Sequence, residues 1–254
     1  MNKYLKNLNR VEFVITYDCT GQCIHCSQGE HKTNKIHLDG KACEMVLRDV
    51  MQKYNITSVM TFGGEPLLYP DSVYAIHNVA KNMGIPQRQL ITNGYFSLNK
   101  EQIQMVAHKI HDCGVNDLLL SVDCFHQKTI PLEPVMDFAK AVKDTGTNIR
   151  LNPAWLVSKD DKNEYNIKTR EIVDEFINIG IIEGVGNVVF PEGNAKKYLM
   201  EYFEKDKEYI NPYSDDPMDV TCISINPDGS IFDGNIYDES ILKILKRYDA
   251  KKEA

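Results

Sequence analysis

The sequence predicts an α/β fold in which parallel strands alternate with helices and curl into part of a barrel. Three observations carry this prediction. Strand-like and helix-like stretches alternate between residues 11 and 190, several helix-like stretches end at glycine, and the motifs rich in glycine and polar residues directly follow strands. Right-handed helical crossovers between parallel strands are typical of a TIM barrel. We therefore expect a partial TIM barrel, (β/α)6, followed by a small hairpin-and-helix extension.

The individual elements follow from local patterns. Short runs rich in apolar and β-branched residues predict strands at residues 11–16, 57–62, 89–92, 117–122, 148–156 and 185–190. Apolar residues spaced by three and four positions predict helices at residues 39–54, 71–83, 100–113, 133–144 and 165–179. In this class of fold the loops at the carboxyl ends of the strands build the active site, so function is expected there.

The pattern changes from about residue 196. Residues 196–209 predict a polar helix, residues 220–232 predict a β-hairpin, and residues 239–248 predict a last helix. The hairpin turn is expected at Asn226-Pro227-Asp228-Gly229, because these residue types favour tight turns. The chain is therefore expected to have a core domain at residues 1–195 and a C-terminal extension at residues 196–254.

Composition excludes several classes of protein. The 254 residues carry a formal net charge of −7, which argues against nucleic acid as the main partner. No run approaches the roughly 20 apolar residues that a membrane span needs, and no apolar signal-peptide core follows the N-terminus. We therefore expect a cytoplasmic protein with no membrane partner. Its seven cysteines are then expected to be thiols or metal ligands rather than disulfides.

Three cysteines lie close together on the loop after the first predicted strand. Cys19, Cys23 and Cys26 have the spacing C-x3-C-x2-C, and Gly21 should help this loop to turn tightly. Thiolates are soft ligands that suit iron–sulfur clusters and zinc. Three ligands on a four-iron cluster would leave one iron open to a cofactor or substrate. The residues alone also allow a zinc site completed by His25, in a non-catalytic metal-binding scaffold protein.

Residues 16–26 read Thr-Tyr-Asp-Cys-Thr-Gly-Gln-Cys-Ile-His-Cys, which resembles the signature of the radical S-adenosylmethionine (SAM) superfamily. The segment is most similar to the maturase-like branch, in which a histidine often precedes the third cysteine. Gly-Gly-Glu-Pro at residues 63–66, Thr-Asn-Gly at 92–94 and Ser-Val-Asp at 121–123 support the resemblance, which extends over roughly residues 10–195. It implies a [4Fe–4S] cluster on the three cysteines, with SAM on the open iron. An electron from the cluster would cleave SAM into methionine and a 5'-deoxyadenosyl radical.

The positions expected to face SAM lie on or after successive strands. They are Gly63, Gly64, Glu65, Asn93, Ser121, Asp123 and Asn152. By resemblance, Glu65 would lie near the SAM ammonium, Ser121 near its carboxylate or ribose, and Asp123 near a ribose hydroxyl. Structural roles stay open beside these: the glycines and Asn93 can form turns, and Ser121 and Asp123 can cap a strand end. Asn152 is polar within an apolar strand and needs a hydrogen-bond partner, which a ribose or carboxylate could supply.

Other reactive side chains have simpler expectations. His126 is expected to be a solvent-exposed loop histidine, with a contact to the substrate as the alternative. Cys43 and Cys113 fall within predicted helices and are expected to be buried thiols. Cys124 lies near the expected mouth of the active site, and its role is left open.

The predicted tail resembles a shortened version of the SPASM or twitch extension that many radical SAM enzymes carry. Cys222 and the hairpin after it resemble the opening of that extension, but Gly234 occupies the position where another cysteine is usual. We therefore expect a single cluster in the chain, with Cys222 as a leftover thiol of the core.

The expected function is that of a radical SAM enzyme whose deoxyadenosyl radical removes a hydrogen atom from a substrate. The maturase-like cysteine triplet and the tail favour a peptide or protein as the substrate, and a small molecule is the alternative. Such an enzyme also needs an electron donor, such as flavodoxin or ferredoxin. The sequence does not select the outcome of the reaction.

Overall fold

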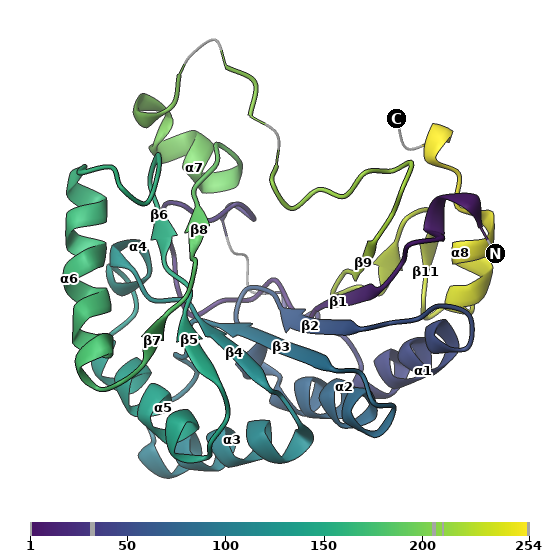
Figure 1. Cartoon of the computed structure of the whole chain (residues 1–254), viewed down its shortest axis with the longest axis horizontal. Helices are drawn as coiled ribbons and strands as arrows, with labels where there is room; N and C mark the ends of the chain where they lie inside the picture. The colour runs from purple at the N-terminus through teal and green to yellow at the C-terminus, as the bar shows by residue number, and fades with distance from the viewer. Residues whose placement is uncertain (1, 31–33, 205–206, 210, 253–254) are drawn as a thin grey trace.

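The computed structural model describes residues 2–30, 34–204, 207–209 and 211–252. Its centre is one parallel sheet with the strand order β7-β5-β4-β3-β2-β1-β9 (Figure 1). The strands are β1 (Arg10–Val14), β2 (Ser58–Phe62), β3 (Gln87–Thr92), β4 (Asp117–Leu120), β5 (Ile149–Leu151), β7 (Ile182–Glu183) and β9 (Cys222–Ile225). The sheet curves but does not close, because β7 and β9 are its two edges. The expected partial barrel is confirmed.

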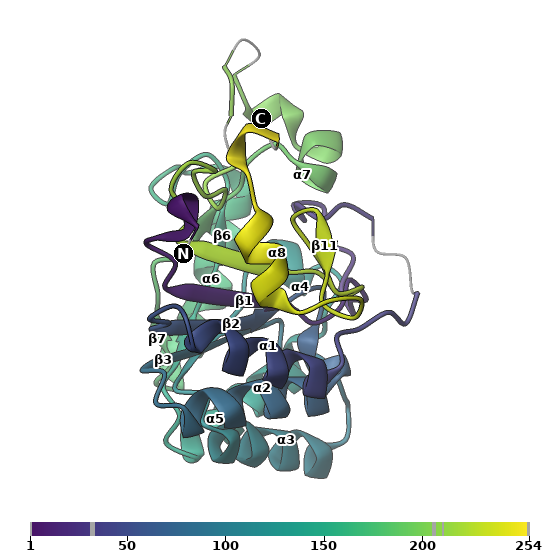
Figure 2. The same ribbon diagram turned by 90° about the vertical axis from the view of Figure 1, so that its right-hand side faces the viewer.

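Helices cover the convex face of this sheet (Figure 1). They are α1 (Gly40–Met51), α2 (Pro70–Asn82), α3 (Lys100–Cys113), α5 (Leu132–Asp144) and α6 (Glu164–Asn178). Strand residues that face them are apolar and fully buried, as Phe13 and Leu118 show. Each such side chain contributes about 1.5–3 kcal/mol to folding when it leaves water. The last helix, α8 (Ile241–Arg247), packs beside α1 at the β9 end of the molecule (Figure 2).

Local sequence explains where these helices begin and end. The Asn99 side chain accepts hydrogen bonds from the backbone N–H groups of Glu101 and Gln102, so it caps the start of α3. Gly114 ends the same helix with φ +96°, in the left-handed region that favours glycine. Asp39 caps α1 through the backbone N–H of Ala42.

Shorter elements complete the chain. The 3-10 turns are η1 (Lys3–Leu5), η2 (Pro66–Leu68), η3 (Met200–Tyr202) and η4 (Ala250–Lys252), and the short helices are α4 (Cys124–Gln127) and α7 (Gly193–Tyr198). Two small sheets pair β6 (Ala154–Trp155) with β8 (Asn187–Val188) and β10 (Ser230–Ile231) with β11 (Gly234–Asn235). Within the described ranges, no helix has the length and apolar character that crossing a membrane requires.

Two of the predicted strands are wrong in their extent. The strand predicted at 148–156 divides into β5 and β6 around Pro153, which has no N–H to continue a ladder. The strand predicted at 185–190 is shorter, and as β8 it pairs with β6 rather than with the main sheet. The main-sheet strand at this point is β7, which lies before the predicted range.

The tail also differs from its prediction. The turn predicted at residues 226–229 is present, with the Gly229 N–H donating to the Asn226 carbonyl oxygen at 2.9 Å. The strand pairing of the hairpin predicted at 220–232 is wrong, because β9 pairs in parallel with β1 while β10 pairs with β11. The polar helix predicted at 196–209 is replaced by α7 and η3, and residues 205, 206 and 210 lie outside the described residues. The division at residue 195 stays a prediction, although β9 shows that part of the expected extension belongs to the main sheet.

The concave face of the sheet carries a layer of paired polar side chains near the amino ends of the strands. Arg10 binds Glu12 through Nε–Oε1 at 2.7 Å and donates from Nη1 to Gln89 at 3.0 Å. Gln89 in turn donates to Asp117, which forms a two-point ion pair with Arg150 at 2.9 Å for both bonds. The positive and negative charges of this layer therefore balance.

Candidate active site at the carboxyl ends of the strands

The loops after β1 to β5 surround a cavity of about 240 Å³. Most of the residues predicted to bind the cluster or SAM line it, namely Cys19, Cys23, Cys26, Gly63, Gly64, Asn93, Ser121 and Asn152. Glu65 and Asp123 do not line this cavity, and both side chains are fully buried behind it. The structure therefore brings the predicted positions together around one cavity, with Glu65 and Asp123 buried next to the residues that line it.

The three cysteines of the first loop face this cavity and form no disulfide. Burial raises the pKa of Cys19 to about 12, and the neighbouring acidic groups Glu65 and Cys26 add to the rise. Burial also raises the pKa of Cys23, which interacts electrostatically with both other thiols. A metal or cluster that binds here must therefore displace protons, as thiolate ligands require. None of the seven cysteines, all of which lie in the described ranges, forms a disulfide in the structure.

The donor set fits an iron–sulfur cluster better than a preformed zinc site. A tetrahedral zinc ion with bonds of about 2.3 Å to sulfur would hold its sulfur ligands roughly 4 Å apart. Among the described residues, one group of three metal-type side chains has all its donor atoms within 4.8 Å of one another, and it is His25, Asp123 and His126. The three cysteine sulfurs form no such group, although they share one cavity.

Two glycines fix the start of the cysteine loop. The backbone N–H of Gly64 donates to the carbonyl oxygen of Thr16 at 2.7 Å. The backbone N–H of Glu65 donates to the backbone carbonyl oxygen of Asp18 at 2.8 Å. A Cβ on Gly64 would collide with the backbone of Asp18, and one on Gly63 would collide with Thr16. These glycines therefore allow close approach between the loops after β1 and β2, in addition to lining the cavity.

Glu65 joins the loops after β2 and β3. Its carboxylate accepts hydrogen bonds from the Leu67 N–H at 2.9 Å, the Thr92 hydroxyl at 2.7 Å and the Asn93 N–H at 2.8 Å. Burial raises the pKa of Glu65 to about 7, against the lowering effect of these three donors. Asn93 then directs its side-chain amide towards Cys19 and Thr20. The predicted contact of Glu65 with SAM stays a prediction, since this carboxylate is engaged with the protein.

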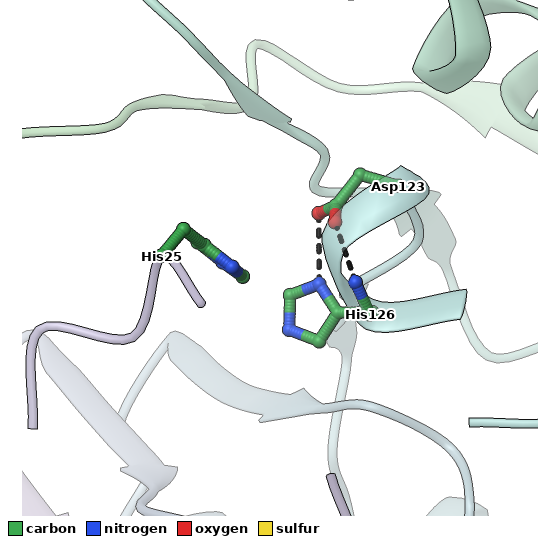
Figure 3. Close-up of side chains that lie close together, drawn as sticks. All are labelled: His25, Asp123 and His126. Atoms are coloured by element: carbon green, nitrogen blue, oxygen red, sulfur yellow. Dashed lines mark hydrogen bonds and ion pairs between the residues drawn. The ribbon is translucent and has the colours of Figure 1, made fainter. Parts of the chain in front are cut away.

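Asp123 holds a histidine at the wall of the cavity (Figure 3). Its carboxylate accepts from His126 Nδ1 at 2.8 Å, from the Phe125 and His126 backbone N–H groups, and from the Ala154 N–H. It thereby caps α4 and ties β4 to β6. In Figure 3 the ring of His25 points towards His126, and the two ring centroids are 4.8 Å apart.

The expectation that His126 is an exposed loop residue is wrong. It lies on α4, its side chain is 17% exposed, and it lines the cavity. Burial alone would lower the pKa of His126, but the Asp123 carboxylate raises it above its ordinary value. Burial acts to raise the pKa of Asp123, but the neighbouring His126 and His25 outweigh it. The pKa of Asp123 is therefore below its ordinary value. The predicted bond between Asp123 and a ribose stays untested, and here its oxygens already have four donors.

Sequence reasoning missed the contribution of α7. The backbone N–H of Asn194 donates to the carbonyl oxygen of Cys26 at 2.8 Å, and its side chain donates to that of Cys23 at 3.0 Å. A Cβ on Gly193 would collide with the backbone of the same loop at Ser27. No local pattern connects residues 193–194 with a loop some 170 residues earlier, so only the fold reveals this contact.

The remaining cysteines divide into two kinds. Cys43 and Cys113 are buried in α1 and α3, as expected. Cys124 is half-buried on α4 but does not line the cavity. Cys222 is half-buried on β9 and lines a second, larger cavity, so the expectation of a core thiol is wrong.

Comparisons with known proteins agree with this geometry. Residues 13–157 match the family model described as Radical SAM superfamily. The chain is 23% identical over 223 residues to a probable GTP 3',8-cyclase of Saccharolobus solfataricus, covering 81% of this chain and 68% of that protein. It is 26% identical over 204 residues to the GTP 3',8-cyclase of Listeria monocytogenes, covering 74% of this chain and 58% of that protein.

Solved structures share the fold at lower identity. SuiB of Streptococcus suis bound to S-adenosylmethionine matches with a TM-score of 0.64 and 15% identity, over 96% of this chain and 66% of that chain. The protein described as native anSMEcpe with bound AdoMet matches with a TM-score of 0.60 and 14% identity, over 97% and 82% of the two chains. The chain thus spans about two thirds of the length of SuiB.

Proposed function

The chain belongs to the radical SAM superfamily, whose enzymes use a [4Fe–4S] cluster and SAM, and we propose that Cys19, Cys23 and Cys26 hold that cluster. The observation that carries this proposal is the convergence of the three thiols with strand-end residues on one cavity. A [4Fe–4S] cluster on three cysteines supplies the electron that splits SAM into methionine and a 5'-deoxyadenosyl radical. Hydrogen abstraction from a bound substrate is the proposed reaction.

In this proposal, residues of the chain position SAM in the cavity and keep water away from it. Gly63 and Gly64 present backbone beside the cysteines without side chains that would fill the cavity. Asn93 and Ser121 follow β3 and β4 and place polar groups on the same wall, suited to the polar parts of SAM. Phe62 and Ile91 line the same cavity and limit the access of water.

A peptide or protein is the substrate that we favour. The fold is shared with SuiB bound to its precursor peptide SuiA, at a TM-score of 0.60. It is also shared with anSMEcpe bound to AdoMet and a Cp18Cys peptide, at a TM-score of 0.58. A small molecule is the second candidate, because the sequence relatives are named GTP 3',8-cyclases. A one-electron donor such as flavodoxin or ferredoxin completes the proposal.

The proposed core domain, residues 1–195, would then hold the one cluster, and residues 196–254 would form a shortened extension without an auxiliary cluster. Cys222 is the only cysteine after residue 195, which supports this assignment. Iron analysis after anaerobic reconstitution should give about four irons per chain, as one four-iron cluster requires. A clearly higher value would contradict a single cluster.

The decisive experiment is SAM cleavage by anaerobically purified, reconstituted protein. We expect a brown protein that absorbs broadly near about 400 nm, as iron–sulfur thiolate sites do, and that forms 5'-deoxyadenosine with SAM and a reductant. A colourless, zinc-loaded protein that leaves SAM intact would instead identify a non-catalytic metal-binding scaffold.

A further inference from the structure

The cofactor cavity has few charged groups on its wall. Among the described residues that line it, none is a lysine, arginine, aspartate or glutamate, and the side chains that can become cations are His25 and His126. SAM carries a carboxylate, and an anion that leaves water is costly unless a charged or hydrogen-bonding partner meets it. Proteins usually bind carboxylates with arginine or lysine, which this wall lacks. A histidine is therefore the candidate partner for the SAM carboxylate.

One ring nitrogen of His126 is fixed by the protein, and the other is left for a ligand. Nδ1 donates to the Asp123 carboxylate at 2.8 Å. That carboxylate also accepts from backbone N–H groups, namely those of Phe125, His126 and Ala154. Figure 3 shows the second ring nitrogen, Nε2, on the side of the ring away from Asp123. No described residue forms a hydrogen bond with Nε2, and the ring lines the cavity, so it is preorganised for a ligand.

His126 lies at the end of the cavity where the cysteines converge. Besides Asp123, the acidic groups Cys26 and Glu65 interact electrostatically with its ring. In the proposed function SAM occupies the open iron of a cluster on these cysteines. The amino and carboxylate groups of an amino acid can chelate a metal ion through nitrogen and oxygen, so the amino-acid end of SAM suits this end of the cavity. The partner of its carboxylate is therefore expected near His126.

His25 is the weaker candidate for this contact. Its Nδ1 is buried without a partner, and no acidic residue in the described ranges hydrogen-bonds to the ring to orient it or to balance a charge. The ring instead packs on Phe125, with the centroids 4.8 Å apart. His126 differs because it already has one carboxylate at Nδ1. A second carboxylate at Nε2 would place the ring between two anions, where both nitrogens carry protons and both donate.

Neutral side chains on the same wall can only assist. Asn93, Ser121 and Asn152 line the cavity and can donate hydrogen bonds to SAM. They cannot balance a negative charge, because amides and hydroxyls stay uncharged. Ser121 is expected beside the carboxylate or the ribose, and either contact is compatible with a charged partner at His126.

We propose that His126 binds the carboxylate of SAM through Nε2, and that Asp123 is the positioning residue that fixes the ring for this contact. The inference rests on the proposed function. It adds the residue that distinguishes SAM from a cofactor analogue without a carboxylate. Asp123 acts from behind the cavity wall, because it orients His126 and stabilises its positive charge.

The experiment measures binding to the reconstituted holoenzyme, kept anaerobic and without a reductant so that SAM stays intact. The two probes are SAM and decarboxylated SAM, which lacks only the carboxylate. Equilibrium dialysis of the radiolabelled probes gives their dissociation constants, expressed per cluster from the iron content. The ratio of the two constants reports what the carboxylate contributes to binding. Any contribution from the iron is common to the wild type and the variants, so a change in the ratio reports the protein contact.

Two variants remove the nitrogen that is left for the ligand. His126→Asn places an amide nitrogen near the position of Nδ1, so the hydrogen bond to Asp123 can persist while Nε2 is lost. The dissociation constant of SAM should rise about tenfold or more, as loss of a charge-assisted hydrogen bond predicts, and that of decarboxylated SAM should change less than about twofold. His126→Phe keeps a ring without a donor and should give the same pattern. His108→Asn, on the exposed face of α3, is the matched control and should leave both constants unchanged.

Each outcome supports or overturns the inference. A loss of about tenfold for SAM alone supports it. Equal losses for both probes, or no loss for SAM, would overturn it, because His126 would then not meet the carboxylate. If neither variant retains iron, His126 supports the cluster itself, and the inference is overturned as well. All of these results leave the proposed function standing, whereas a wild-type protein that holds no cluster or cleaves no SAM would overturn both.

Discussion

The side-chain amide of Asn194 donates a hydrogen bond to the carbonyl oxygen of Cys23 at 3.0 Å, across 171 residues of sequence. Asn194 is 7% exposed, so this bond is shielded from water. The cysteine loop is therefore held by α7 as well as by the neighbouring strand-end loops.

Replacing Asn194 by alanine should loosen the cysteine loop. The Cys23 carbonyl would lose a buried donor, which costs about 1–3 kcal/mol of unfolding free energy. Urea unfolding of the cluster-free protein measures this loss, and iron content after reconstitution should fall with it. The exposed Asn55→Ala variant is the control. Unchanged stability and iron content in N194A would show that α7 does not position the loop.

Each of the proposed cluster ligands should be indispensable. Single changes to alanine at Cys19, Cys23 and Cys26 should abolish 5'-deoxyadenosine formation and the brown colour, because an Fe–S cluster needs its thiolates. Cys113→Ala removes a buried thiol outside the cavity and should keep both properties. Retained turnover in any of the three ligand variants would remove that cysteine from the ligand set.

Glu65→Gln should weaken the hydrogen bonding that connects the loops after β2 and β3. At pH 5 the Glu65 carboxyl group is protonated, because its pKa is raised to about 7, and both of its oxygens can still accept hydrogen bonds. Glutamine can accept at one position only, so its NH₂ group would face the Asn93 or Thr92 donor instead of accepting from it. A loss of about 1–3 kcal/mol in unfolding free energy is expected from the unsatisfied donor. The measurement is urea unfolding at pH 5. A variant as stable as the wild type would contradict the bridging role of this carboxylate.

The same residue predicts a pH dependence. Because the pKa of Glu65 is raised to about 7 from 4.5, the folded protein holds this proton more tightly than the unfolded chain does. Its stabilising contribution is complete below pH 4.5 and is lost as pH rises through 7, by roughly 3 kcal/mol in total. Unfolding free energies of wild type and E65Q between pH 4.5 and 8 should therefore converge. A difference that stays constant with pH would show that Glu65 keeps an ordinary pKa.

Asp123→Asn should change the titration of His126. The carboxylate raises the pKa of His126 in the wild type, whereas burial acts to lower it. Without the carboxylate, burial should bring this pKa below the ordinary value of 6.5. Proton NMR of the histidine ring in cluster-free protein measures the shift, with Asp112→Asn on the surface of α3 as the control. A pKa that stays high in D123N would assign the shift to another group.

Local sequence was sufficient for the parts of the site that lie next to each other in the chain. The spacing of Cys19, Cys23 and Cys26 and the two glycines after β2 predicted which loops meet, because parallel strands bring their carboxyl ends to one edge. The supporting contacts of Asn194 and Asp123 could not be predicted, because they depend on how distant elements pack. The strand pairing of the predicted hairpin failed for a similar reason, although its turn is present. Cys222–Ile225 alternates as a hairpin strand would, but it pairs with the edge of β1 instead.

The pairing of β9 with β1 places a strand from near the end of the chain beside the first strand of the sheet. The strand that leads into the cysteine loop is consequently an interior strand, protected on both edges. A fragment ending before residue 222 would expose a full row of backbone donors and acceptors on β1. Such an exposed edge can pair with a strand of another molecule and promote aggregation. Efforts to trim this enzyme to a minimal catalytic piece should therefore keep the tail.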